Sequence, residues 1–260
     1  EHRNLRVSLT DRCSLRCTYC MPNDFAAWIP NDDLLTTNEL LTVIEVAVEQ
    51  GINEVRLTGG EPLLRPDIVE IVDRIAGLAN APRLTLTTNG LKLKELALPL
   101  AKAGLNRINI SLDTLSRERF KKLTYRDRFD DVIEGLHAAK AAGLFPIKVN
   151  TVLLQGINDD EAPALLAWAI ENEYSLRFIE QMPLDAGGIW DRATMVTADQ
   201  IYADLSTRYE LTPVDGRGSA PAEEFYINGT QATVGIIGSV TRPFCGACDR
   251  LRLTSDGQLR

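Results

Sequence analysis

The sequence predicts an α/β fold: an incomplete barrel of six parallel strands, with a C-terminal extension that covers the barrel opening. Two observations support this prediction. A short strand-like run is followed by an amphipathic helical run six times over, which is typical of a parallel α/β sheet. The strands also carry polar side chains on one face, whereas a closed eight-stranded barrel normally fills its interior with branched apolar residues. A wider, incomplete barrel that holds polar ligands satisfies both observations.

Strands and helices alternate regularly between residues 5 and 179. The predicted strands are Leu5–Thr10, Glu54–Thr58, Arg83–Thr88, Arg107–Leu112, Ile147–Leu153 and Leu176–Ile179. The helical runs between them are Glu39–Glu49, Asp67–Leu78, Leu93–Ala103, Phe129–Ala142 and Asp160–Glu173. Several of these runs end at a glycine, as helix C-caps often do, and these glycines are Gly51, Gly77, Gly104 and Gly143.

The chain from Met182 onward is expected to form the extension. It contains one more helical run, Ala198–Tyr209, and two short strand candidates, Glu223–Ile227 and Thr233–Ile237. We therefore predict a barrel domain over residues 1–181 and an extension over residues 182–260.

Composition excludes several classes of function. The chain has 260 residues and a net charge of −8, which disfavours a general nucleic-acid binder, since such proteins usually carry a basic balance. No apolar run approaches the roughly 20 residues that span a bilayer, and the N-terminus shows no secretory apolar region. We therefore expect a cytoplasmic protein that binds neither nucleic acid nor membranes.

Three cysteines follow the first predicted strand in the loop Asp11–Pro22. Cys13, Cys17 and Cys20 form a C-x3-C-x2-C pattern, one thiolate short of the four that usually hold an iron–sulfur cluster. The fourth iron would then be open to a small molecule such as S-adenosylmethionine (SAM). The alternative is a zinc site with His2 or Cys245 as fourth ligand, although zinc sites more often use paired C-x2-C groups.

Two glycines end the second predicted strand, in the run Gly59-Gly60-Glu61-Pro62. Without a Cβ atom, glycine lets the backbone approach a ligand closely. The exposed peptide groups at this point can bind an amino group. This short run alone is weakly specific, but after the cysteine loop it favours SAM.

Cationic side chains occupy the polar face of the predicted strands or alternate near the C-terminus. Side chains alternate between the two faces of a strand, so these cations can surround one cavity. A triphosphate is the natural partner, because arginine binds phosphate oxygens in a bidentate manner. For any single arginine, a surface salt bridge is the alternative. The residues are Arg6, Arg56, Lys148, Arg177, Arg250 and Arg252.

The cysteine loop followed by Gly59-Gly60-Glu61-Pro62 resembles the radical SAM superfamily, whose fold is a partial (β/α)6 barrel. The resemblance covers residues 5–180 and implies a [4Fe–4S] cluster on Cys13, Cys17 and Cys20. It also implies SAM-binding residues. Gly60 would contact the amino group and Ser111 the carboxylate or ribose region, while Tyr19 and Met182 would contact the adenine region through their main chains.

Further motifs resemble one subfamily, the GTP 3′,8-cyclases of molybdenum cofactor biosynthesis. They are the runs at residues 5–13, 56–65, 87–90, 109–113 and 245–252. The likeness implies a second [4Fe–4S] cluster on Cys245, Cys248 and a third cysteine that would fall two positions after Arg260, and we expect the natural protein to continue. The implied GTP contacts are Arg6, Arg56, Thr87, Lys148, Arg177, Arg250, Leu251 and Arg252.

The implied activity is a lyase that converts GTP to (8S)-3′,8-cyclo-7,8-dihydroguanosine 5′-triphosphate, in which Arg250 and Arg252 act as catalytic residues that orient and charge-stabilise the substrate. The implied partners are a reducing electron donor and the downstream cyclic pyranopterin monophosphate synthase, with a homodimer as an open alternative. Two rivals remain. One is a peptide-modifying radical SAM enzyme with an auxiliary cluster, and the other is a non-catalytic zinc or iron–sulfur binding module.

Overall fold

The computed structural model describes residues 2–21, 28–184, 188 and 190–260. Its strands are β1 (Asn4–Ser8), β2 (Glu54–Thr58), β3 (Arg83–Thr88), β4 (Arg107–Ser111), β5 (Lys148–Val152), β6 (Ser175–Ile179), β7 (Leu211–Pro213), β8 (Glu223–Ile227), β9 (Thr233–Ile237) and β10 (Arg250–Leu253). Its α-helices are α1 (Thr37–Glu49), α2 (Ile68–Ala76), α3 (Leu93–Lys102), α4 (Arg117–Thr124), α5 (Phe129–Ala141), α6 (Ala162–Glu171) and α7 (Ala198–Ser206).

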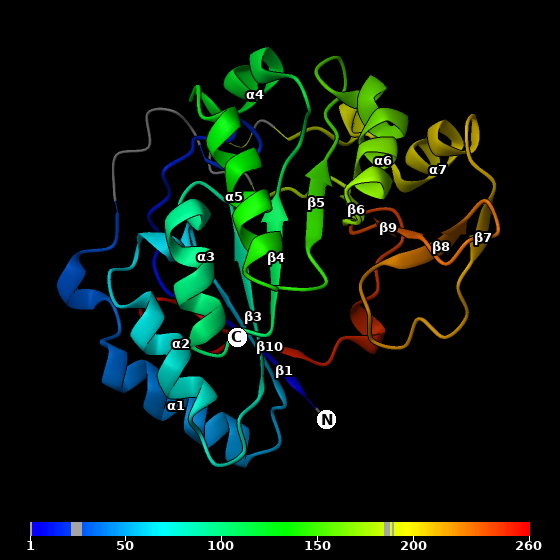
Figure 1. Ribbon diagram of the computed structural model, residues 1–260. Coiled ribbons are helices and arrows are strands. Elements are labelled where there is room, and N and C mark those ends of the chain that lie inside the picture. The colour runs from blue at the N-terminus through cyan, green and yellow to red at the C-terminus, as the bar shows by residue number, and fades with distance from the viewer. Residues whose placement is uncertain (1, 22–27, 185–187, 189) are drawn as a thin grey trace.

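All the strands of the described residues belong to one sheet, in the order β10-β1-β2-β3-β4-β5-β6-β9-β8-β7. The strands from β10 to β9 in this order are parallel to their neighbours, and only the pairs of β8 with β9 and of β7 with β8 are antiparallel. The helices follow one another along one side of the sheet, and α3 and α5 lie side by side in front of β3 and β4 (Figure 1). The predicted incomplete α/β barrel is confirmed.

The predicted alternation along the strands is also confirmed. Every second residue of β1, β2, β5 and β6 is buried and the residues between are half-buried. Val7, Val55 and Val149 belong to the buried apolar core, as expected for side chains that pack under the helices. The opposite face is therefore free to line a cavity.

Two predicted C-caps illustrate how the helices end. Gly104 has a φ of +102°, a left-handed conformation that glycine adopts without strain. Gly77, in contrast, caps α2 in a right-handed conformation with a φ of −81°. Both glycines therefore mark a helix end as predicted, although only Gly104 adopts the left-handed conformation.

One α-helix and two strands of the described residues were not predicted. Helix α4 is mostly charged and buries only a narrow stripe that includes Phe120 and Leu123, so its apolar period is weak. Strand β7 has three residues, and β10 lies within the cysteine- and arginine-rich run near the C-terminus. The predicted helix Ala198–Tyr209 ends earlier, at Ser206.

The C-terminal part extends the barrel sheet at both edges. Strand β9 pairs with β6, and β10 pairs with β1. The carboxylate of Glu180 also joins the two parts, because it accepts hydrogen bonds from the backbone amides of Ala198, Val240 and Thr241 at 2.7, 2.8 and 2.9 Å. The division at residues 181 and 182 stays a prediction, since one sheet passes through both sides of it. No helix of the described part of the chain has the length and apolar character to cross a membrane.

Candidate functional site

A cavity of about 390 Å³ opens along the polar face of the barrel strands. It extends from the cysteine loop after β1 to the segment after β6. Many of the predicted site residues meet there. Those that line it are Arg6, Cys13, Cys17, Tyr19, Cys20, Arg56, Gly60, Thr87, Ser111, Arg177 and Met182.

The three cysteines of the first loop form a donor set that suits a metal cluster. Burial is the first cause that raises the pKa of Cys13, Cys17 and Cys20, and neighbouring acidic groups raise it further. Thiols with raised pKa values release their protons when a metal centre supplies compensating positive charge. The three sulfur atoms thus share one cavity in an environment that favours a bound cation over free thiolates.

A four-iron cluster and a single zinc ion require different arrangements of their ligands. Among the residues that the structure describes, no three His, Cys, Asp or Glu side chains are placed to hold one metal ion. A zinc ion needs its ligands around one point, whereas in a four-iron cluster each cysteine binds a different iron. Cys13, Cys17 and Cys20 all line the cavity, so each can contribute one thiolate to the predicted cluster.

The Gly-Gly-Glu run after β2 is hydrogen-bonded to the backbone of the cysteine loop. The amide of Gly60 donates to the carbonyl of Thr10 at 2.7 Å, and that of Glu61 donates to the carbonyl of Arg12 at 2.7 Å. A Cβ atom on Gly60 would lie 2.3 Å from the Arg12 carbonyl oxygen. The close approach that requires glycine here is thus made to the cysteine loop itself.

The other side of the cysteine loop rests on α4. The amides of Arg16 and Thr18 donate to the carbonyls of Thr124 and Leu123 at 3.0 and 2.9 Å. These carbonyls lie at the end of the helix, where no further turn supplies N–H groups to donate to them. The unpredicted helix therefore has a direct role in holding the loop.

Tyr19 connects the cysteine loop to the end of β4. Its hydroxyl donates to Asp113 Oδ2 at 2.8 Å, and the backbone amide of Val152 donates to Asp113 Oδ1 at 2.9 Å. Burial raises the pKa of Asp113 to about 6. Asp113 thus joins the loop to both β4 and β5.

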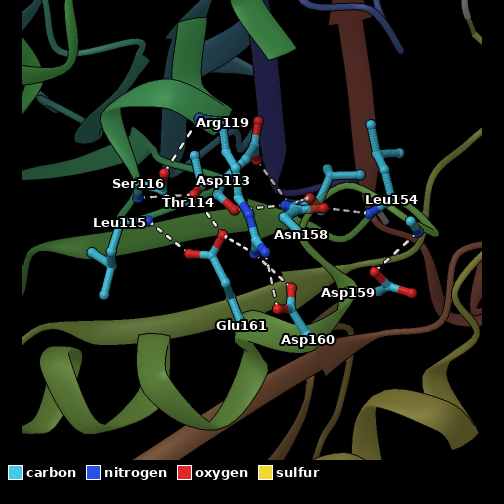
Figure 2. Close-up of polar contacts among 12 residues, drawn as sticks. Asp113, Thr114, Leu115, Ser116, Arg119, Leu154, Asn158, Asp159, Asp160 and Glu161 are labelled. Carbon is cyan, nitrogen blue, oxygen red and sulfur yellow. Dashed lines mark hydrogen bonds and ion pairs between the residues drawn. The ribbon is translucent and has the colours of Figure 1, made fainter. Parts of the chain in front are cut away.

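Asn158 holds the loop that carries Asp113 (Figure 2). Its buried side-chain amide donates to the carbonyls of Asp113 and Val152 at 2.6 and 3.0 Å and accepts from the amide of Leu154 at 2.7 Å. One side chain therefore satisfies backbone groups of the loop after β4, of the last residue of β5 and of the loop after β5.

Glu161 completes this network (Figure 2). It accepts from the Thr114 hydroxyl at 2.7 Å, from the Leu115 amide at 2.9 Å and from Arg119 at 2.7 Å. Arg119 belongs to α4, and it also bonds Asp160 at 2.6 Å. The loops after β4 and β5 and the helix that supports the cysteine loop therefore form one connected polar network.

The arginines predicted to bind phosphate come together across neighbouring strands. Arg252, Arg6 and Arg56 lie opposite one another in the register of β10, β1 and β2. The Nε atom of Arg6 is buried without a hydrogen-bond partner. Burial first, and then nearby Arg56, Arg250 and Arg252, lower the pKa of Arg6 to about 9. Such a concentration of positive charge in a partly buried position is relieved when an anion binds to it.

Lys148 and Arg177 extend the cationic surface on β5 and β6. Burial, followed by the charges of Arg177 and Arg107, lowers the pKa of Lys148 to about 7. Arg177 pairs with Glu224 at 2.7 Å, and its Nε is buried without a partner. Arg177 lines the cavity, whereas Lys148 does not.

The C-terminal cysteines lie in an exposed turn before β10. Cys245 and Cys248 are both exposed, and the amide of Cys248 donates to the carbonyl of Cys245 at 3.2 Å. Phe244 links this turn to the arginines, since the guanidinium of Arg250 lies 5.1 Å from its ring centre and that of Arg217 lies 5.5 Å away. Two thiols form a partial donor set for a cluster.

The predicted site residues of the C-terminal run do not line the cavity, namely Cys245, Cys248, Arg250, Leu251 and Arg252. Leu251 lies opposite Leu5 in the register and packs against the apolar core. Its side chain is therefore on the face away from the cations, and only its main chain is available to a ligand on the polar face.

Sequence reasoning missed several residues that contact or support the residues lining the cavity. Asn89 donates to Cys13 Sγ at 3.8 Å and to the Ser14 hydroxyl at 3.1 Å, and it belongs to a motif from which only Thr87 had been assigned. Asn158 and Glu161 gave no signal, since their partners lie elsewhere in the chain. Arg107 could have been found, because it precedes Asn109 by two positions and so shares its face.

The chain matches two family models. Residues 7–169 match the model described as the radical SAM superfamily, and residues 174–260 match the one described as Molybdenum Cofactor Synthesis C. Among curated relatives, the GTP 3′,8-cyclase of Streptomyces coelicolor is 60% identical over 99% of this chain and 76% of that protein. The GTP 3′,8-cyclase of Mycolicibacterium smegmatis is 51% identical over 99% of this chain and 73% of that protein.

Solved structures show similarity in fold. Streptococcus suis SuiB bound to S-adenosylmethionine has a TM-score of 0.69 at 17% identity, over 99% of this chain and 57% of that chain. HydG, a maturase of the [FeFe]-hydrogenase, has a TM-score of 0.61 at 17% identity, over 78% of this chain and 48% of that chain. At these identities the likeness concerns the arrangement of strands and helices.

Proposed function

The chain belongs to the radical SAM superfamily and, within it, to the GTP 3′,8-cyclases, and we propose that the cavity between its cysteine loop and its arginine row is the active site. The reaction converts GTP to (8S)-3′,8-cyclo-7,8-dihydroguanosine 5′-triphosphate, the first step of molybdenum cofactor biosynthesis. It uses [4Fe–4S] clusters and SAM. The observation that carries the site assignment is that Arg6, Arg56 and Arg177 line the same cavity as the three cysteines.

Cys13, Cys17 and Cys20 would hold the cluster that binds SAM. When bound, the cluster and SAM supply the one-electron chemistry that removes a hydrogen atom from C3′ of GTP. Gly60 and Ser111 would bind the amino-acid part of SAM, while Tyr19 and Met182 would bind its adenine region. All four line the cavity beside the cysteines, which supports this assignment. The chain itself positions both molecules and excludes water.

The cationic surface would bind the triphosphate of GTP. Arg6, Arg56 and Arg177 offer guanidinium groups from inside the cavity, and each forms bidentate hydrogen bonds with phosphate when correctly oriented. Thr87 also lines the cavity and offers a hydroxyl. Lys148, whose pKa is lowered to about 7, would gain a proton when phosphate approaches.

The C-terminal turn would complete the substrate site. Cys245 and Cys248 would hold part of a second cluster near the guanine base of GTP. Arg250, Leu251 and Arg252 follow directly, and the register places Arg252 beside Arg6. Arg250 and Arg252 would orient the substrate and stabilise developing charge.

We extend the proposal to partners and location. GTP and SAM are charged metabolites of the cytoplasm, so we place the reaction there. A reducing electron donor must supply the electron, and a cyclic pyranopterin monophosphate synthase would take the product. A homodimer is the oligomeric state that we propose to test by light scattering.

Anaerobic reconstitution with iron and sulfide tests the proposed function. The reconstituted protein should bind at least about three irons per chain for the first cluster, cleave SAM to 5′-deoxyadenosine with a reductant, and convert GTP. Cys13→Ala should abolish the cleavage, whereas Ser206→Ala at the exposed end of α7 should not. Absence of deoxyadenosine from the unmodified protein would rule out this site assignment. Cleavage without GTP binding would instead favour the peptide-modifying alternative.

A further inference from the structure

Arg107, the first residue of β4, belongs to the same row as the arginines already described. It lies opposite Thr85 in the register of β3 and β4, and Thr85 lies opposite Arg56. The row therefore continues across five neighbouring strands. In the order of the sheet it consists of Arg252, Arg6, Arg56, Thr85 and Arg107.

The alternation along β4 places Arg107 on the polar face. Asn109 and Ser111, two and four residues further on, both line the cavity, and side chains two apart in a strand share a face. Arg107 itself is buried and does not line the cavity. It lies next to Arg56, which does.

Arg107 and Arg56 share one carboxylate oxygen. Arg56 Nη2 lies 2.9 Å from Glu54 Oε1 and Arg107 Nη2 lies 3.4 Å from the same atom. The Nε atom of Arg107 is buried without a hydrogen-bond partner. Two guanidinium groups thus share one carboxylate oxygen, and the longer of the two contacts belongs to Arg107. Arg56 has a second acceptor in the Thr85 hydroxyl, at 3.2 Å from its Nε.

The charge around Arg107 is not balanced by this contact. Burial lowers the pKa of Arg107, and while Glu54 raises it, nearby Arg83, Arg56 and Arg177 lower it further. Arg107 in turn contributes to the lowered pKa of Lys148. A buried cation that lacks sufficient counter-charge is stabilised by an arriving anion with several charges.

We propose that Arg107 is a further phosphate-binding residue for GTP, and that Glu54 holds Arg107 and Arg56 side by side until phosphate replaces it as the acceptor. Arg107 starts β4, whereas the cysteine loop follows the other end of β1, so Arg107 lies towards the end of the barrel away from the cysteines. A triphosphate extends away from the sugar that reacts. Arg107 therefore binds the β- and γ-phosphates, which GMP lacks, and so favours GTP over GMP. This inference rests on the proposed function.

Nucleotide binding to the reconstituted, full-length protein tests the inference. Dissociation constants for GTP and GMP are measured by isothermal titration for the unmodified protein, Arg107→Gln and Arg74→Gln. Arg74 lies on α2 and pairs with Glu70 on the exposed surface, so its variant loses the same charge away from the cavity. We expect Arg107→Gln to weaken GTP binding about ten- to a hundredfold, with GMP binding and the Arg74→Gln variant nearly unchanged.

A second variant and a kinetic measurement separate binding from folding. Arg107→Lys keeps the charge but not the planar fork, and should give an intermediate loss of GTP affinity. KM for GTP should rise in both variants while kcat at saturating GTP stays nearly constant. Iron content and SAM cleavage without GTP report whether each variant is folded. If Arg107→Gln fails to fold, the GTP affinity of the Arg107→Lys variant tests the role of Arg107.

The outcomes distinguish this inference from the function on which it rests. Unchanged GTP affinity in a folded Arg107 variant, or equal losses for GTP and GMP, would overturn the role of Arg107 and leave the proposed function intact. A failure of the unmodified protein to bind GTP would overturn the proposed function.

Discussion

Arg252 and Arg6 lie directly opposite each other on the parallel strands β10 and β1, although they come from opposite ends of the chain. The side chains of register partners in a parallel pair leave the sheet on the same side, so two guanidinium groups are held close together. Burial first, and then the neighbouring arginines, lower the pKa of Arg6 to about 9. The strand pairing therefore builds a repulsive cluster whose stability depends on a bound anion.

Inorganic triphosphate should therefore stabilise the protein even without guanosine. A ligand at a hundred times its Kd stabilises the native state by about 2.7 kcal/mol, which corresponds to a rise in Tm of about 5 to 10 °C for a chain of this size. Differential scanning fluorimetry measures the shift. Sodium chloride at equal ionic strength is the control, and Arg252→Ala should reduce the response. An equal shift with sodium chloride would show that the effect is general screening.

The affinity for GTP should fall as the pH rises above 7 because of Lys148. Its pKa is lowered from 10.5 to about 7, so above pH 7 the free protein must take up a proton to present the ammonium group to phosphate. The contribution of Lys148 is complete below pH 7 and decreases by up to about tenfold per pH unit above it. Without ligand the sign is opposite: unfolding takes up the proton between pH 7 and 10.5, so stability rises with pH there.

Isothermal titration between pH 6 and 8 checks this prediction, with Lys148→Arg as the matched variant. Arginine stays charged in this range, so the ratio of the two dissociation constants isolates the lysine from the titration of GTP itself. A ratio that does not change with pH would contradict the prediction.

Asn158→Ala should destabilise the chain by about 2 to 4 kcal/mol, because it leaves three backbone groups without their hydrogen-bond partner in a buried position. Those groups belong to Asp113, Val152 and Leu154. Urea unfolding of the metal-free protein measures the loss, and the exposed Asn80→Ala serves as control. Equal midpoints for the two variants would show that the network in Figure 2 does not stabilise the loops.

Gly60→Ala should lower the iron bound per chain after reconstitution. Its Cβ would lie 2.3 Å from the Arg12 carbonyl oxygen, and the cysteine loop must move to relieve that clash. Gly77→Ala is the control, since its Cβ would lie 3.3 Å from the nearest atom, the Asp73 carbonyl oxygen. Iron analysis and far-ultraviolet circular dichroism are measured together. Full iron content in Gly60→Ala, with loss of SAM binding alone, would instead limit Gly60 to a role in binding SAM.

Local patterns in the sequence were sufficient to predict most of the barrel. The bounds of β2 and β3 are those predicted, because alternating apolar residues specify which face of a strand is buried. The C-x3-C-x2-C spacing and the Gly-Gly run also led to the correct family. These signals are contained in a few consecutive residues, so no knowledge of distant parts of the chain is required.

Tertiary structure decided which side chains of different strands lie next to one another. The pairing of β10 with β1 places Arg252 beside Arg6, and the register of β2, β3 and β4 brings Arg107 towards Arg56 and Glu54. Asn158 finds Asp113 only because two loops end at the same edge of the sheet. The sequence by itself determined the alternation, the cysteine spacing and the face of each cation. Strand order and register decided which cations share a counter-ion, because those depend on contacts between residues far apart in the chain.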